Sequence, residues 1–211
     1  MRSLRSLLWP GLAEGEQADR EAAIAPPPPD AHDSEPLAIT RAFAFLDIRG
    51  FTAYCDRHGE RAAVELLTRF RDLTRAVAIR RGVRVSKWLG DGVMLVGLEP
   101  APLAATAAEI VARCSAAGIH IHAGLASGPV LLFEGDDYIG RPANLAARLC
   151  DVAGEGEVLV HGDFDVPDWL ALSEPVTISV PGIGEVSGVR RLTMTIELPP
   201  DGAGELTDQP E

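Results

Sequence analysis

The sequence predicts an α+β domain with a ferredoxin-like β-α-β-β-α-β core, additional αβ elements, and a mainly antiparallel sheet covered by helices. Short apolar runs, typical of strands, alternate with longer segments whose apolar residues recur every three or four positions, as in amphipathic helices. The runs at 83–85 and 93–96 flank Gly90-Asp91-Gly92, which predicts a β-hairpin and so an antiparallel pair of strands.

The first half of the domain contains this hairpin and most of the predicted helical segments. In chain order we expect a strand over 42–47, helices over 51–58 and 60–80, the hairpin over 83–96 and a helix over 101–117. From Ala63 to Val77, apolar residues recur at three- and four-residue steps, which indicates that one face of that helix packs on the sheet. Gly118 is expected to stop the last helix.

The second half is predicted to be richer in strands. We expect strands over 119–125, 130–133, 157–160, 176–180 and 189–198, a helix over 142–152 and a small helical turn over 164–172. His120 and His122 alternate along the first of these strands and so share a face. Without nearby acids or cysteines, such a pair is more typical of plain strand residues than of metal ligands.

Composition limits the class of protein. The chain has 211 residues, 46% of them hydrophobic, enough for one full core. A formal charge of -12 argues against sequence-independent binding to nucleic acid, which needs Lys and Arg. Cys55, Cys114 and Cys150 suggest neither a disulfide framework nor a zinc site, and no apolar run approaches the roughly 18 residues of a membrane span. We expect a cytoplasmic protein without nucleic-acid partners or stable membrane insertion.

The termini differ in composition from the middle of the chain. Residues 1–39 are predicted to form a flexible segment whose prolines, Pro26-Pro27-Pro28-Pro29, favour an extended spacer. The apolar part of its start is too short for a convincing signal peptide, which leaves weak peripheral membrane contact or a short docking segment as alternatives. The globular domain is expected over 40–198, and a disordered acidic tail over 199–211.

Two acids stand at strand ends. Asp47 follows the apolar run 43–46 and precedes a predicted helix, while Asp91 is expected to be presented at the tip of the hairpin. Either acid alone is typical of a helix cap or an ordinary turn. Two strand-end carboxylates on separate elements, however, are what a pair of divalent cations needs.

A third informative stretch runs from Asp137 to Arg148. Asn144 and Arg148 are four residues apart in its predicted helix, so both project from one face. On its own this pattern is typical of a solvated helix face.

Taken together, the three stretches resemble the class III nucleotide cyclases. The resemblance runs from about residue 40 to 160 and rests on Phe45-x-Asp47-x-x-Gly50-Phe51-Thr52, Lys87-x-x-Gly90-Asp91-Gly92 and the segment 137–148. It implies that two divalent cations, Mg²⁺ or Mn²⁺, bind Asp47 and Asp91, with the backbone carbonyl of Ile48 as a further ligand.

The resemblance also implies a substrate. Lys87 and Asp137 match the pair that reads adenine, since Lys can donate to a ring nitrogen and a carboxylate can accept from the exocyclic amine. Asn144 matches the residue that orients the ribose, and Arg148 the one that stabilises charge on the phosphates. The implied activity is that of an adenylate cyclase, in which the 3′-hydroxyl of ATP attacks the α-phosphorus to give 3′,5′-cyclic AMP and pyrophosphate.

In this family the metal aspartates and the base-reading residues meet across a dimer interface, so a homodimer with two sites is implied. The sequence departs from the family at Pro181, where a triphosphate-binding Lys is often found, and Arg190, Arg191 and Arg141 are the candidate replacements. Two other interpretations stay open: a cyclase for guanine or pyrimidine nucleotides, and a weakly active nucleotide-binding module that regulates a partner.

Overall fold

The computed structural model describes residues 38–133 and 137–197, so the predictions for the N-terminal segment before residue 38 and for the tail lie outside the described residues. The elements in chain order are β1 (Ala38–Ile48), α3 (Phe51–Arg80), β2 (Arg84–Leu89), β3 (Gly92–Gly97), α4 (Pro100–Ala116), β4 (Ile121–Phe133), β5 (Asp137–Ile139), α5 (Arg141–Val152), β6 (Val158–His161), β7 (Leu170–Leu172), β8 (Val176–Val180) and β9 (Gly184–Met194).

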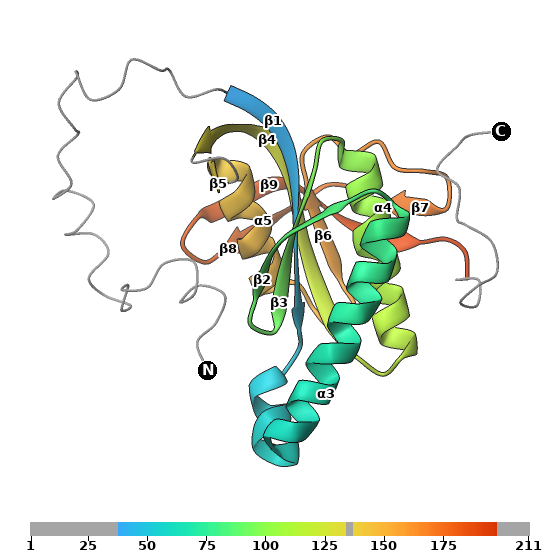
Figure 1. Ribbon diagram of the computed structural model, residues 1–211. Helices are drawn as coiled ribbons and strands as arrows, with labels where there is room; N and C mark the ends of the chain where they lie inside the picture. The colour runs from blue at the N-terminus through green and yellow to red at the C-terminus, as the bar shows by residue number, and fades with distance from the viewer. Residues whose placement is uncertain (1–37, 134–136, 198–211) are drawn as a thin grey trace, which may run out of the picture.

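One sheet organises these elements (Figure 1). Its strands lie in the order β2-β3-β1-β4-β6-β9-β7, while β5 pairs with β4 and β8 pairs with β9. Among the described strands, β4 and β6 run parallel and the other pairs are antiparallel. The predicted α+β fold with a mainly antiparallel sheet is therefore confirmed.

Helices cover both faces of the sheet because the central strand β1 is apolar on both sides. Ala44 and Leu46 pack in a core with α3 and α4, whereas Phe43 and Phe45 pack in a second core with α5. This division follows from the two-residue period of a strand, which sends neighbouring side chains to opposite faces.

Helix α3 is broken at Gly59, as the sequence predicts between residues 58 and 60. Gly59 has φ 81° and ψ 169°, values outside the helical region, and the positive φ is one that glycine adopts without strain. The first part of α3 and this bend project beyond the sheet in Figure 1, while Phe70 and Val77 of the second part are buried in the core.

Helix α5 lies unusually close to β4 because of one glycine. A side chain at Gly124 would meet the backbone of α5, with the Cys150 nitrogen 2.1 Å and the Ala146 oxygen 2.3 Å from its Cβ. Only a residue without a Cβ allows this approach. Gly124 therefore helps to set the position of the helix that carries Asn144 and Arg148.

Several predicted strand boundaries are wrong. The strands predicted over 119–125 and 130–133 form the single strand β4, because β1 pairs with it from Ile48 opposite Ile121 to Ala38 opposite Leu131. For the same reason β1 starts before the predicted residue 42. Strand β9 both starts and ends earlier than the predicted 189–198.

The predicted helical turn over 164–172 is also wrong. The structure has a loop followed by the short strand β7, whose Leu170 pairs with Met194 of β9. Pairing with a distant strand overrides the local pattern in this segment.

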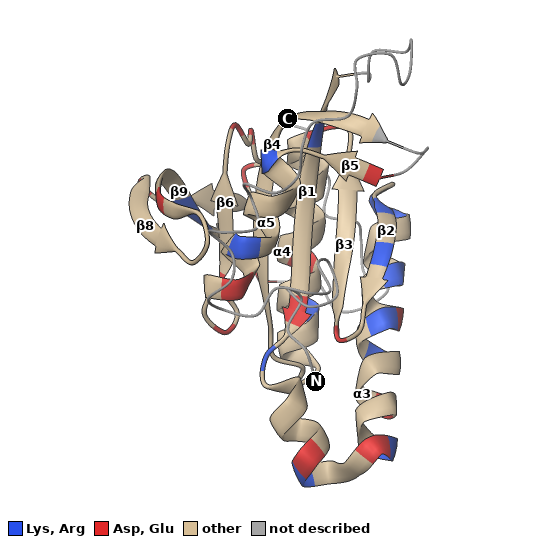
Figure 2. Ribbon diagram, turned by 90° about the vertical axis from the view of Figure 1, so that its left-hand side faces the viewer, with Lys and Arg blue, Asp and Glu red and all other residues tan. Residues whose placement is uncertain are grey.

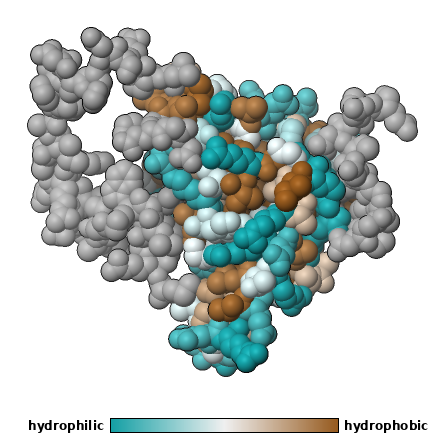
Figure 3. Space-filling view, in the orientation of Figure 1, coloured by the Kyte–Doolittle hydropathy of each residue, from teal (hydrophilic) through white to brown (hydrophobic). Residues whose placement is uncertain are grey.

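The described surface is mixed in character. On the face shown in Figure 3, hydrophobic residues lie in separate patches among hydrophilic ones. The helices within the described ranges were all too short or too polar to cross a membrane.

Candidate active site

The two predicted metal-binding acids lie next to each other. Asp47 is at the end of β1, opposite Gly92 in the antiparallel pair with β3, and Asp91 forms the turn between β2 and β3. The backbone N–H of Ile48 donates to the carbonyl of Asp91 at 3.3 Å, which joins the two segments directly. Figure 2 shows acidic residues at both places, the end of β1 and the β2–β3 turn.

The electrostatics of this pair favour a cation. Burial, followed by the negative charge of Asp47, raises the pKa of Asp91 from 3.8 to about 6. Asp91 is partly buried, which corrects the expectation of a fully presented acid. Asp47 has a buried oxygen, Oδ1, that accepts no hydrogen bond from any described residue. A bound cation would offset both the repulsion and the unsatisfied oxygen.

The ligand chemistry fits Mg²⁺ or Mn²⁺. Two carboxylates and the carbonyl of Ile48 are hard oxygen donors of the kind these ions prefer. Within residues 38–133 and 137–197 no group of three or more His, Cys, Asp or Glu side chains is suited to hold a metal. The remaining ligands would therefore come from water and from the phosphate oxygens of a substrate.

Arg71 of α3 holds the hairpin tip, a role that the sequence analysis missed. Its guanidinium donates to the carbonyl of Gly90 at 3.2 Å and lies over the ring of Trp88, 5.1 Å from the centroid. Arg75 lies over the same ring at 5.1 Å. Arg71 is 19 residues from Gly90 in the sequence, and no local sequence pattern predicts this contact.

The structure brings the two predicted base-reading residues together. Lys87 on β2 and Asp137 on β5 form an ion pair through Nζ and Oδ1, although 50 residues separate them. Their side chains are 40% and 51% exposed, so the pair contributes little to stability. Next to it, the ring of Tyr138 packs edge-on against Phe43, with the centroids 5.3 Å apart.

Asn144 and Arg148 lie on α5, which follows β5 directly in the chain and is far in sequence from Lys87. Asn144 is exposed, and Nη1 of Arg148 donates to Oδ2 of Asp151 at 3.1 Å. Burial raises the pKa of Asp151; the charge of Asp47 adds to this, and Arg148 opposes it. In the described chain, neither Asn144 nor Arg148 forms a hydrogen bond or ion pair with Asp47.

The candidate replacements for a triphosphate-binding Lys lie on α5 and β9. Pro181 lies in the turn between β8 and β9. Arg191 pairs with Glu157, Arg141 is the exposed first residue of α5, and Arg190 lines a cavity of about 430 Å³. Among these arginines, the structure therefore shows none positioned at the turn itself.

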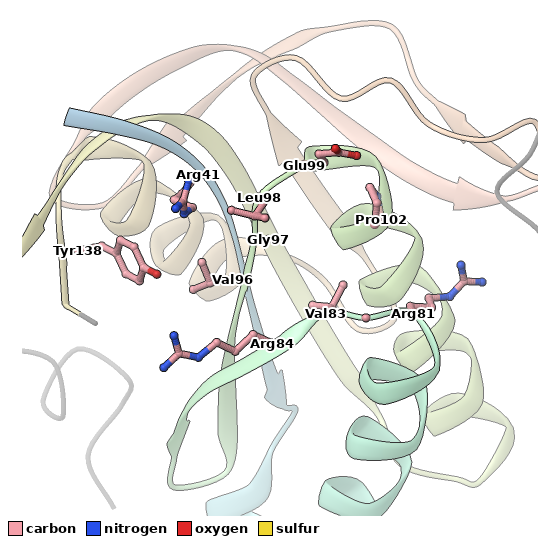
Figure 4. A pocket seen from close by; sticks show the side chains of 11 residues that line it. Arg41, Arg81, Val83, Arg84, Val96, Gly97, Leu98, Glu99, Pro102 and Tyr138 are labelled. Carbon is pink, nitrogen blue, oxygen red and sulfur yellow. The ribbon is translucent and has the colours of Figure 1, made fainter. Parts of the chain in front are cut away.

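A second cavity, of about 450 Å³, lies at the other end of β1 (Figure 4). Its lining includes Arg41, Arg84, Val96, Leu98 and Tyr138. Arg41 and Asp47 are six residues apart on one strand, or about 20 Å. This cavity is therefore not the carboxylate site, although Tyr138 connects it to Asp137.

Comparison with solved structures identifies the fold. The chain matches the guanylate cyclase domain of a Catenaria anguillulae protein solved with GTP, with a TM-score of 0.60, 22% identity, and coverage of 75% of this chain and 98% of that domain. It matches the adenylyl cyclase CyaB from P. aeruginosa with a TM-score of 0.59, 23% identity, and coverage of 80% and 99%. The fold is that of the class III nucleotide cyclase catalytic domain.

Sequence relatives point the same way. The chain is 34% identical to an adenylate cyclase of Streptomyces coelicolor over 141 residues, which is 64% of this chain and 36% of the relative. It is 36% identical to an uncharacterized protein of Mycobacterium tuberculosis over 146 residues, or 67% and 38% of the two chains. No family model matches. The resemblance to class III nucleotide cyclases found in the motifs is confirmed in the fold and in the sequence relatives, and the chain spans less than two fifths of the length of these curated relatives.

Proposed function

We propose that this chain is an adenylate cyclase, which converts ATP to 3′,5′-cyclic AMP and pyrophosphate by attack of the ribose 3′-hydroxyl on the α-phosphorus. The observation that carries the proposal is the contact between Lys87 and Asp137, which places a cationic donor and an anionic acceptor side by side. These are the two groups that an adenine edge needs.

The proposed contacts of Lys87 and Asp137 with the nucleotide base explain the preference for adenine. The Lys87 ammonium donates to a ring nitrogen, and the Asp137 carboxylate accepts from the exocyclic amine. Guanine has a carbonyl at the position of that amine, so its oxygen would face the carboxylate without a proton between them. The proposed base site thus favours ATP through attraction to one base and repulsion of the other.

Asp47, Asp91 and the carbonyl of Ile48 would hold two divalent cations, Mg²⁺ or Mn²⁺. Such ions neutralise the phosphates and lower the pKa of the attacking hydroxyl. The chain's own part is to keep the two carboxylates adjacent, through the Ile48 to Asp91 hydrogen bond and the contact of Arg71 with the hairpin.

Asn144 orients the ribose and Arg148 stabilises the charge that develops on the phosphates. These side chains do not bond to Asp47 within one protomer, in the part of the chain that the structure describes. We therefore infer a symmetric homodimer in which α5 of one protomer faces the carboxylates of its partner.

The proposal also covers the location of the protein. All three cysteines are free, which fits a reducing compartment, and we assign the chain to the cytoplasm.

A nucleotide panel tests the proposal. The chain is incubated with Mn²⁺ and each of ATP, GTP, CTP and UTP, and cyclic nucleotide is measured, with Asp47→Asn and Asp91→Asn as matched controls. We expect cyclic AMP as the main product and its loss in both variants. A different main product would support the alternative of another nucleotide, which the guanylate cyclase neighbour favours. No product from any nucleotide would support a regulatory module, which Pro181 favours.

A further inference from the structure

His122 lies at the carboxylate site but has no part in the reaction described above. It is only 5% exposed and pairs with Asp47 across the β1–β4 ladder. Its Nδ1 is 2.9 Å from the carbonyl oxygen of Ala153. Because a carbonyl oxygen can only accept, Nδ1 carries the proton in this contact and Nε2 is the free edge of the ring.

That free edge faces the metal-binding candidate. Nε2 of His122 lies 3.8 Å from Oδ2 of Asp47, beyond the length of a hydrogen bond but close enough to limit where the carboxylate can turn. The other carboxylate oxygen, Oδ1, is the buried one that no described residue satisfies. One oxygen of Asp47 is thus against the imidazole, and the other is left for a cation.

The ring itself is held firmly in place. Ala153, whose carbonyl accepts the Nδ1 proton, is the C-cap residue that follows α5. Its carbonyl also accepts from Nη1 of Arg49 at 3.4 Å, and the thiol of Cys150 lies 3.7 Å from the His122 carbonyl oxygen. The end of α5 therefore fixes the ring, and the ring in turn borders the carboxylate.

We propose that His122 is a positioning residue that orients the Asp47 carboxylate for a divalent cation. The inference rests on the proposed function, since it assigns the metal to Asp47. His122 contacts no substrate atom in this scheme and acts through Asp47 alone. Groups that orient a metal ligand from behind commonly change metal affinity by about 10- to 100-fold when they are replaced.

His120 provides a matched control two residues away. Its side chain is 57% exposed, and its Nδ1 lies 2.7 Å from Oε1 of Glu155. His120 is therefore on the surface and does not face Asp47 or Asp91. The same substitution at His120 and His122 thus changes the same chemical group in two different surroundings.

Mn²⁺ binding to the full chain, followed by electron paramagnetic resonance without nucleotide, tests the inference directly. We compare the wild type with His122→Phe, His122→Asn, His120→Phe and Asp47→Asn. Asn keeps a donor near the Nδ1 position and lacks the Nε2 edge, so it separates anchoring at Ala153 from contact with Asp47 and provides a folded variant if Phe is not tolerated. We expect about tenfold weaker Mn²⁺ binding in both His122 variants and none of this change in His120→Phe.

The kinetic companion experiment measures turnover against Mn²⁺ concentration. For the His122 variants we expect the half-activating Mn²⁺ concentration to rise about tenfold, with a smaller effect on kcat at saturating metal. If both His122 variants keep the wild-type Mn²⁺ affinity while Asp47→Asn loses it, the positioning role of His122 is overturned and the metal assignment stands. Unchanged affinity in Asp47→Asn overturns the metal assignment in the proposed function as well.

Discussion

Glu109 offers a test of how α4 is held against the C-terminal end of α3. This carboxylate on α4 is buried, with 2% of its side chain exposed, and it pairs with Arg80, Arg81 and Arg113. Oε2 accepts from Nε of Arg81 at 2.7 Å, and Oε1 accepts from Nε of Arg113 at 2.7 Å. Replacing Glu109 with Gln keeps the shape of the side chain and removes its charge.

The expected loss of stability follows from the surroundings of the three arginines. The Arg81 side chain is 5% exposed and Arg113 is 12% exposed, so neither can reach water easily once the carboxylate is gone. Removing one partner of a buried ion pair costs about 3–5 kcal/mol. Arg80 is one-third exposed and can turn outward, so we expect the lower end of this range, about 3 kcal/mol, or a fall in Tm of about 6–12 °C.

The pH dependence provides a second signature. Burial alone raises the pKa of Glu109, but hydrogen bonds from Arg113 and Arg81 and the charges of Arg81 and Arg80 outweigh it, so the pKa lies below its ordinary value of 4.5. A carboxyl group whose pKa is lower in the folded state stabilises the fold above its unfolded pKa and loses this effect as the pH falls. The wild type and Glu109→Gln should therefore differ most near pH 7, and the difference should begin to shrink as the pH falls below about 4.5 and continue to shrink through the lower folded-state pKa.

Urea unfolding followed by circular dichroism at several pH values measures both effects. Glu65→Gln is the control, because Glu65 forms an exposed pair with Arg61 at 3.5 Å and its loss should change little. Equal unfolding free energies for wild type and Glu109→Gln at pH 7, or a difference that stays constant as the pH falls well below 4.5, would refute the assignment of a buried charge cluster.

The remaining predictions concern the proposed reaction. Lys87→Glu should greatly lower ATP turnover without preventing Mn²⁺-dependent binding of the triphosphate; unchanged rates with ATP and GTP contradict the base site. Arg148→Ala should lower kcat by about 100-fold and leave nucleotide binding largely intact, so an effect confined to KM argues against its role. Co-expressed Asp47→Ala and Arg148→Ala chains should recover about one quarter of wild-type activity, because half of the dimers are mixed and each has one complete site of two. Inactive mixed dimers, with dimerisation verified by size-exclusion chromatography, would rule out the shared site.

Local sequence determined those elements whose geometry a few neighbouring residues decide. Gly90-Asp91-Gly92 between two apolar runs specifies the β2–β3 hairpin, and Gly59 ends the first part of α3, because glycine adopts backbone angles that other residues resist. The two acids, Asp47 and Asp91, could also be chosen from the local sequence, because neighbouring residues mark the strand ends. Each lies at a strand end that the sequence marks.

Contacts between distant segments decided the rest. The sequence of residues 119–133 predicts two strands because Gly128 and Pro129 interrupt the apolar pattern. Pairing with β1 along its length nevertheless keeps β4 continuous. Strand β7 exists only because β9 is beside it. Hydrogen bonding to a distant partner has no local signature, so the sequence could not predict either outcome.

The same distinction applies within the site. Lys87 and Asp137 could be chosen from the sequence, but only the folded arrangement of β2 and β5, which pair with β3 and β4, brings their charged groups into contact. His122 could be predicted only as a strand residue, since its partners are a carboxylate 75 positions earlier and a helix end 31 positions later. The local sequence determines residue type and backbone preference, whereas tertiary packing determines which neighbours orient a carboxylate.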